Sequence, residues 1–221
     1  MEIETFISFL PELKHFQHSA FQFFALVVVI ILSFYTYISV KKGRRGFLII
    51  LLDTIVNFWK ETCEGIMGEE GRRYVPFVSS IFIFILVMNL MGLIPGFMPP
   101  TMNINTNLGM AVFVFFAYNI IGFREHGIKY VKHFIGPLPI MAVLYMPVEI
   151  ISHVFRMVSL SVRLAGNMFG DHSVLEIFTH LVPILVPVVF LILGSIVSLV
   201  QAFVFSLLSA IYISLAISHE H

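Results

Sequence analysis

The sequence predicts an all-α integral membrane protein. We expect about five transmembrane helices plus one amphipathic helix on the membrane surface, with the last two helices long and strongly tilted as a hairpin. Composition is the first reason, because the 221 residues are 58% hydrophobic and only 12% charged, whereas soluble domains carry roughly 25% charged residues. The second reason is that uncharged stretches long enough to cross a bilayer recur along the chain. We treat residues 1–221 as a single membrane domain.

Charge and cysteine content exclude several classes of protein. Thirteen basic and 13 acidic residues give no net charge, so nucleic acid is not an expected partner. The single cysteine, Cys63, excludes a disulfide framework and a cysteine-based zinc site. We therefore expect neither a cofactor nor a metal, and membrane lipid as the surroundings of the chain.

The first half of the chain predicts one crossing followed by a surface helix. Residues 19–40 carry no charge, which suffices for one crossing of about 20 residues. The residues before them form no basic n-region, so this segment is interpreted as a retained helix and not as a signal peptide. Residues 47–64 repeat apolar side chains at helical spacing opposite a charged side, which indicates a helix on the membrane surface with Trp59 as an interfacial anchor. The alternative for 47–64 is a poor transmembrane span.

Two helical hairpins are expected to follow. Residues 75–123 are uncharged and interrupted by a cluster of Pro, Gly and Asn, which favours a loop between two antiparallel transmembrane helices. Residues 138–218 are expected to form the long tilted hairpin. Its second helix has no proline after Val188 and could run about 45 Å, against a hydrocarbon core of about 30 Å. It must therefore either tilt strongly or break near Gly194, and we favour the tilt.

The distribution of Lys and Arg predicts the orientation in the membrane. Only Lys14 falls on one side of the expected spans, and an excess of Lys and Arg marks the cytoplasmic side. The N-terminus is therefore expected outside and the C-terminus in the cytoplasm. The cytoplasmic residues would be Lys41, Lys42, Arg44, Arg45, Lys60, Arg72, Arg73, Arg124, Lys129 and Lys132.

The chemistry is expected in one polar stripe within residues 147–172. Polar side chains follow one another there at three- and four-residue steps, which puts them on one face of a helix. Ionisable groups inside a membrane are costly and normally face a bundle interior or a water-filled cavity, so the stripe indicates the wall of a water path. Its members are Glu149, Ser152, His153, Arg156, Ser159, Arg163, Asn167, Gly170 and Asp171.

The next helix offers a partner stripe to this one. One side of a segment built otherwise of apolar residues is expected to carry Gly194, Ser195, Ser198, Gln201 and Tyr212. The Gln201 amide is able to hydrogen-bond a guanidinium across the hairpin.

Three other interpretations of the polar stripe stay open at this point. The polar residues could join helices in a large transporter, with Arg163 satisfied by a fixed carboxylate. Alternatively, the chain could be a secondary transporter in which Arg163 binds an anionic substrate, although no internal repeat is present. An intramembrane metallohydrolase would use Glu149, His153, Asp171 and His172, but the HExxH pattern is absent.

Several motifs resemble subunit a of the F-type ATP synthases. The segment Ser159–Met168, SLSVRLAGNM, and the segment Leu199–Phe205, LVQAFVF, are similar to that family. Residues 88–95 and the closing residues 216–221 resemble it too, and the likeness covers nearly the whole chain from Ser19 onwards. It implies a multi-pass protein of the bacterial plasma (inner) membrane that has no catalytic residue of its own.

The resemblance also implies roles for particular residues. Arg163 would be the essential arginine that faces the carboxylates of the c-subunit ring, with Gln201 beside it on the final helix. The proton paths would be lined by Glu149, Ser152, Ser159, Asn167, Asp171 and His172. Gly194 departs from the family, because many members carry an ionisable residue there, and Asp171 is expected to supply the missing charge.

Two further features complete what the resemblance implies. The outer loop departs from the family as well, because Thr101, Asn103, Asn105 and Asn107 stand where acidic residues are sometimes found. The implied partners are the c-subunit ring, the b-type subunits of the peripheral stalk and the soluble catalytic sector of the synthase.

Overall fold

The computed structural model describes residues 11–42, 46–93, 100–127, 142–181 and 185–217. All regular structure in these residues is helical. The α-helices are α2 (Pro11–Lys41), α3 (Phe47–Met67), α4 (Val75–Met91), α5 (Ile104–His126), α7 (Ala142–Leu181) and α8 (Leu185–Ile217), with two short 3₁₀ helices, η1 (Gly68–Arg73) and η2 (Pro100–Met102). Outside the described residues lie the start of the expected last hairpin, Lys129, Lys132, residues 94–99 and the C-terminal residues 218–221.

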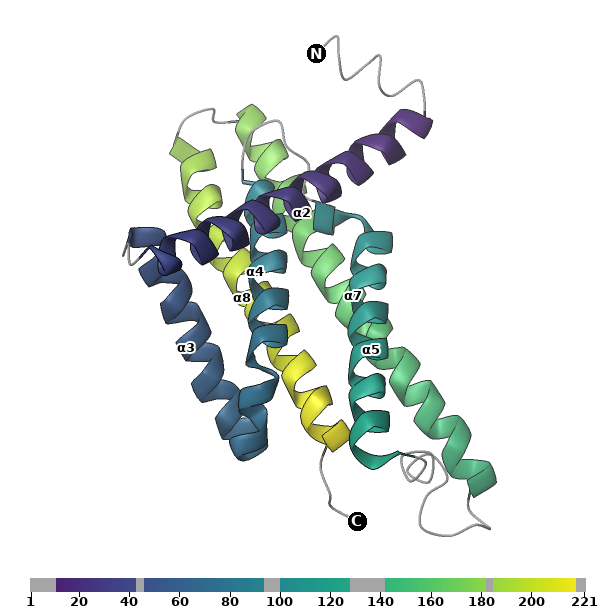
Figure 1. The fold of residues 1–221 in the computed structure, drawn as a ribbon. Helices are drawn as coiled ribbons and strands as arrows, with labels where there is room; N and C mark the ends of the chain where they lie inside the picture. Colours follow the sequence, from purple (N-terminus) through teal and green to yellow (C-terminus); the bar gives the residue numbers. More distant parts are fainter. Residues whose placement is uncertain (1–10, 43–45, 94–99, 128–141, 182–184, 218–221) are drawn as a thin grey trace.

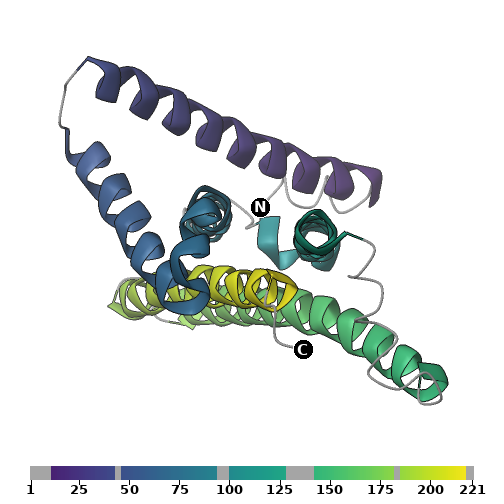
Figure 2. The same cartoon turned by 60° about the horizontal axis from the view of Figure 1, so that its bottom comes forward.

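The helices are arranged in three layers. Helices α4 and α5 form the middle layer, and both pack against α8, which lies with α7 in a second layer (Figures 1 and 2). Helix α2 crosses the opposite side of α4 and α5, while α3 flanks α4 and α8. The polar stripe therefore lies on a helix that packs on one side only, because the other side of the α7–α8 layer faces outward.

The two middle helices have clear local start and stop signals. Pro76 stands in the first turn of α4, where its missing N–H costs nothing. Asn103 caps α5, because its side chain accepts a hydrogen bond from the Asn105 backbone N–H at 3.0 Å. Asn107, inside α5, then donates to the Thr101 carbonyl at 2.6 Å, so Asn103 and Asn107 have structural roles at the start of α5.

Helix α8 is continuous through Gly194. It runs for 33 residues, or about 50 Å, with Pro187 in its first turn. The break that we considered near Gly194 is not present. A methyl group at Gly194 would lie 3.2 Å from Leu93 Cδ2, so the glycine allows α8 to approach the end of α4 closely. A helix of this length fits a hydrocarbon core of about 30 Å only when it is inclined.

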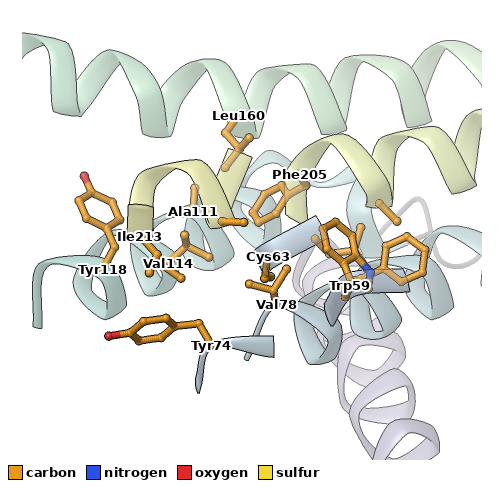
Figure 3. Packing of buried hydrophobic residues seen from close by; sticks show 14 of the residues in the cluster. Trp59, Cys63, Tyr74, Val78, Ala111, Val114, Tyr118, Leu160, Phe205 and Ile213 are labelled. Atoms are coloured by element: carbon orange, nitrogen blue, oxygen red, sulfur yellow. The ribbon is translucent and has the colours of Figure 1, made fainter. Parts of the chain in front are cut away.

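Apolar side chains from the layers meet in one cluster (Figure 3). Trp59 on α3 is 0% exposed, and its ring centroid lies 5.5 Å from that of Phe82 and 5.7 Å from that of Phe203. The expectation that Trp59 is an interfacial anchor is therefore wrong, because the ring joins α3 to α4 and α8. Other members of the cluster are Val78, Ile85, Met88, Ala111, Val114, Tyr118, Leu160, Leu164, Phe205 and Ile213.

Polar contacts hold the end of α5 near the start of α4. Arg73 and Glu125 form a salt bridge of 3.0 Å, and the Tyr74 hydroxyl donates to the same carboxylate at 3.4 Å. Burial in the first place, and the Glu125 carboxylate in the second, raise the pKa of Tyr74 above its usual value of 10.0. The phenol is therefore retained as a neutral donor.

Several described helices are suited to a membrane. Three segments are long and apolar enough to cross one: Gln22–Lys41 in α2, Ile104–His126 in α5 and Val188–Ile217 in α8. A fourth is possible if α3, η1 and α4, which bend by 115°, count as one broken span. The structure thus supports an all-helical membrane protein.

Candidate functional site

Arg163 lies on the outward face of α7 and is exposed. Within the described residues neither a salt bridge nor a hydrogen bond satisfies its guanidinium. Many exposed side chains of α7 and α8 are apolar, so a permanent cation stands on helices whose exposed surface otherwise suits lipid. Such a charge is costly without a partner. The exposed apolar residues are Phe155, Val158, Val162, Phe169, Ile192, Ile196, Leu199 and Val200.

The polar stripe winds around α7 instead of staying on one face of the molecule. Ser159 and Arg163, at its centre, are exposed. Ser152 at one end, and Asn167 with Asp171 at the other, are half-buried. At 3.6 residues per turn, Asp171 is rotated by about 80° from Arg163, which turns that end of the stripe toward α4 and α8.

Two members of the expected site cannot be placed fully. Glu149 and His153 belong to α7, but their side chains lie outside the part of the chain that the structure describes. Among the described residues, no three His, Cys, Asp or Glu side chains gather as metal ligands would.

A small cavity lies where α4, α7 and α8 meet. Its volume is about 30 Å³, and a cavity of roughly 10–15 Å³ already holds a water when polar groups line it. Here Asp171 and His172 of α7 face Asn89 of α4 and Ser198 of α8. The Asp171 Oδ2 and Asn89 Oδ1 atoms are buried and have no hydrogen-bond partner among the described residues. The cavity therefore suits water between two carbonyl-type oxygens.

Asn89 is the residue of this cavity to which sequence reasoning assigned no role. The side chain is 1% exposed, although it belongs to an apolar helix. The sequence does contain a signal for Asn89, namely an amide inside an apolar segment, because a buried amide needs hydrogen-bond partners. That signal does not identify the partner helix, and only the packing of α4 on α8 does.

Gly194 also lines the cavity, directly opposite Leu93. A larger side chain at this position would have to displace Leu93 or fill the cavity. Asp171 supplies a carboxylate to the same space from α7. The geometry thus brings together the two positions that sequence reasoning linked. The aromatic rings of Phe178 and Phe190, stacked with centroids 4.9 Å apart, pack α7 against α8 nearby.

Gln201 is only 9% exposed and lies in the packed side of α8. No hydrogen bond joins its amide to Arg163 in the described part of the chain. The two side chains differ in environment, since Gln201 is enclosed by helices and Arg163 is exposed. The expected contact between them is therefore a prediction for the complete complex and not a feature of the isolated chain.

Arg156, one member of the stripe, has an aromatic partner. Its guanidinium carbon lies 5.3 Å from the centre of the Tyr212 ring on α8, within the range of a cation–π contact. The two arginines of α7 therefore differ, because Arg156 is held against Tyr212, whereas Arg163 has no partner among the described residues.

The fold and this site together define a multi-pass helical membrane protein with a polar, charge-bearing site within its helices. A sequence profile described as the ATP synthase A chain matches residues 20–214. The chain belongs to the ATP synthase subunit a family.

Individual relatives support this placement. The chain is 42% identical to ATP synthase subunit a 2 of Syntrophotalea carbinolica over 208 residues, which cover 94% of this chain and 87% of that protein. It is 50% identical to ATP synthase subunit a of Bdellovibrio bacteriovorus, over 82% of this chain and 78% of the relative. For ATP synthase subunit a of Geotalea daltonii the identity is 44%, over 89% and 84%.

Proposed function

We propose that this chain is the stator subunit a of a proton-translocating ATP synthase. It provides two offset aqueous half-channels and, between them, an arginine that faces the carboxylates of a rotating c-subunit ring. The proposal is carried by the environment of Arg163, an exposed cation with no partner among the described residues, on a helix whose other exposed side chains are mostly apolar. An unpaired guanidinium at this place requires an anionic partner within the membrane, and a rotor carboxylate meets that need. The chain catalyses no reaction itself, so ATP chemistry belongs to partner subunits.

Arg163 acts by electrostatics in this mechanism. A guanidinium stays protonated in any protein environment, so it does not relay protons. A fixed positive charge favours the ionised form of an approaching carboxylate. A rotor carboxyl that arrives protonated therefore releases its proton near Arg163 and is reprotonated from the other path after it has passed.

The same charge separates the two half-channels. It repels a proton that would pass directly from one to the other, so flow requires rotation of the ring. The transmembrane potential supplies about 2.3 kcal/mol per charge for each 100 mV. The pair of Arg163 and carboxylate must also remain loose, since a tight buried ion pair would hold the rotor in place. The exposure of Arg163 agrees with a contact that forms and breaks.

The ends of the polar stripe supply the two paths. Asn167, Asp171 and His172 line the outer path, which includes the cavity with Asn89. At the other end of α7, Glu149, Ser152 and Ser159 line the cytoplasmic path. Gln201 stands beside Arg163 once the ring is in place. The half-burial of Ser152 and Asp171 on either side of an exposed arginine supports this division.

The proposed topology is the one that the sequence predicts. Helices α2, α4, α5, α7 and α8 cross a bacterial plasma membrane, α3 lies on its cytoplasmic surface, and residues 1–221 form one membrane domain. The N-terminus is outside and the C-terminus is cytoplasmic. The partners are the c ring, the b-type peripheral stalk and the soluble catalytic sector.

Cysteine cross-linking to the ring tests this function. Val162 is exposed beside Arg163, whereas Leu164 is 1% exposed on the packed side of α7. We expect Val162→Cys to form a disulfide with a cysteine placed next to the carboxylate of the c subunit, and Leu164→Cys to form none. Equal cross-linking by both variants, or by neither in the assembled complex, would contradict the proposed rotor interface. The native Cys63 is buried and does not interfere.

A further inference from the structure

Arg156 is a second cation on α7, held in a place that differs from that of Arg163. Its guanidinium carbon lies 5.3 Å from the centre of the Tyr212 ring, and that ring lies 5.9 Å from the ring of Tyr118 on α5. Tyr118 is buried and belongs to the central apolar cluster (Figure 3). Three helices therefore contribute to the position of one guanidinium.

The charge of Arg156 is held but not neutralised. The structure has one salt bridge among the described residues, between Arg73 and Glu125. No described carboxylate therefore pairs with Arg156. An aromatic face attracts a cation through the ring quadrupole and leaves its net charge unchanged. Desolvation strengthens that attraction, and Arg156 is half-buried.

Geometry relates Arg156 to Arg163. Seven residues separate them, which is close to two turns, so they point to the same side of α7 about 10 Å apart along its axis. Since the basic residues before α7 indicate the cytoplasmic side, Arg156 lies on the cytoplasmic side of Arg163. A rotor carboxylate next to Arg163 would thus also feel the charge of Arg156.

We infer that Arg156 is a positioning residue for proton exchange with the cytoplasm: a fixed charge, held by Tyr212, that weakens proton binding to the rotor carboxylate on that side of Arg163. This inference rests on the proposed function. A unit charge about 10 Å from the rotor carboxylate, at an effective dielectric constant near 20, changes the proton affinity of that carboxylate roughly tenfold.

Tyr212 matters because an arginine side chain is long and flexible. A released guanidinium would be able to reach the rotor carboxylate and form a close pair, which would slow rotation. Held on the ring, the charge acts at a distance only. The titratable groups near Arg156 among the described side chains are the phenols of Tyr212 on α8 and Tyr118 on α5. The charged residues Arg124, Glu125 and His126 end the neighbouring α5.

The test is the pH profile of ATP-driven acidification in inverted membrane vesicles that contain the whole complex. The cytoplasmic path faces the medium there, so its pH is set directly. During pumping, the rotor carboxyl must take a proton from that side. Without the positive charge its affinity for protons is higher, so uptake continues to higher pH. We expect Arg156→Gln to shift the alkaline limit of pumping upward by about one pH unit.

Conservative variants separate this role from simple packing. Arg156→Lys retains the cation and Tyr212→Phe retains the ring, so both variants should keep the pH profile of the wild type. Arg156→Gln and Tyr212→Leu should displace that profile. Arg72→Gln, which removes an exposed cation of η1, is the matched control and should not shift it. If the Arg156→Gln complex does not assemble, the pH profiles of Tyr212→Phe and Tyr212→Leu are compared instead, and the inference requires that they differ.

Two results would overturn the inference. One is an unchanged profile in both Arg156→Gln and Tyr212→Leu, and the other is pumping by Arg156→Gln lowered by the same factor at every pH. Arg163→Ala in the same vesicles reports on the proposed function separately. Normal pumping by Arg163→Ala would refute that function, whereas lost pumping combined with an unshifted profile in Arg156→Gln would refute the role of Arg156 alone.

Discussion

Asn89 on α4 donates its side-chain N–H to the backbone carbonyl of Ser198 on α8 across 3.2 Å. Both side chains are buried, and both line the cavity that Asp171 and His172 enter from α7. One hydrogen bond thus ties two of the layers together at the wall of the polar cavity. The Oδ1 atom of Asn89 accepts no hydrogen bond from the described residues. The same side chain therefore has an acceptor available for water.

Replacement of Asn89 should impair both packing and proton passage through the outer path. Asn89→Leu keeps the branched shape of the side chain but removes the hydrogen bond and an acceptor, so we expect a loss of about 1 kcal/mol in stability and several-fold slower ATP-driven pumping. Asn119→Leu is the matched control, since the Asn119 amide bonds to Phe115 within α5, at 2.7 Å, away from the cavity. The role of Asn89 is refuted if both variants pump at the same rate.

Asp171 and His172 should together determine access from outside. The double variant Asp171→Asn, His172→Gln retains size and polarity but removes the groups that exchange protons. We expect slower proton-driven ATP synthesis at a fixed driving force, with the complex intact. A synthesis rate equal to that of the wild type would show that other groups line the outer path.

Gly71 should be essential for the packing of η1 on α3. A methyl group there would lie 2.3 Å from the Cys63 backbone oxygen, and an overlap of this kind typically costs 1–3 kcal/mol. We expect Gly71→Ala to lower the melting temperature and to open Cys63, now 0% exposed, to maleimide. Gly65→Ala is the control, because nothing lies within 4 Å of that position. Unchanged maleimide labelling of Gly71→Ala would contradict this packing.

Glu125→Gln should lower the pKa of Tyr74 only in part. Burial is the larger cause of the raised value and the Glu125 carboxylate the second, so the pKa should stay above 10.0 in the variant. Phenolate absorbance at alkaline pH, with Tyr74→Phe as the blank, measures it. A pKa that returns fully to 10.0 would mean that burial has no part.

The same group makes stability depend on pH. A folded-state pKa above the unfolded value favours the protonated form in the folded protein. The contribution of Tyr74 is therefore complete below about pH 10 and is lost as the pH rises through the raised folded value. The exposed pair of Arg73 and Glu125, with side chains 62% and 35% exposed, should add less than about 1 kcal/mol.

The sequence predicted the helical membrane class and the elements because their signals are local. Uncharged segments and turn residues are visible without any neighbour, and α4 and α5 were expected as a pair on that basis. The one-sided position of Arg163 was not predictable from periodicity alone, since a stripe on a helix does not say which part faces outward. Packing of α7 on α5 and α8 decides that.

Contacts between distant segments were the least predictable features. Trp59 was interpreted as an interfacial residue from its place on an amphipathic helix, yet it packs against Phe82 and Phe203. The contact of Arg156 with Tyr212 joins residues far apart in the chain. Each depends on how two helices cross, and no local pattern encodes a crossing.

The central claim is that Arg163 couples proton movement to the rotor. The most direct measurement is ATP-driven acidification of inverted membrane vesicles with Arg163→Ala, with assembly checked by co-purification of the c subunit. We predict that the complex assembles, because only an exposed side chain is removed, and that coupled pumping is lost. Normal pumping by an assembled Arg163→Ala complex would contradict it.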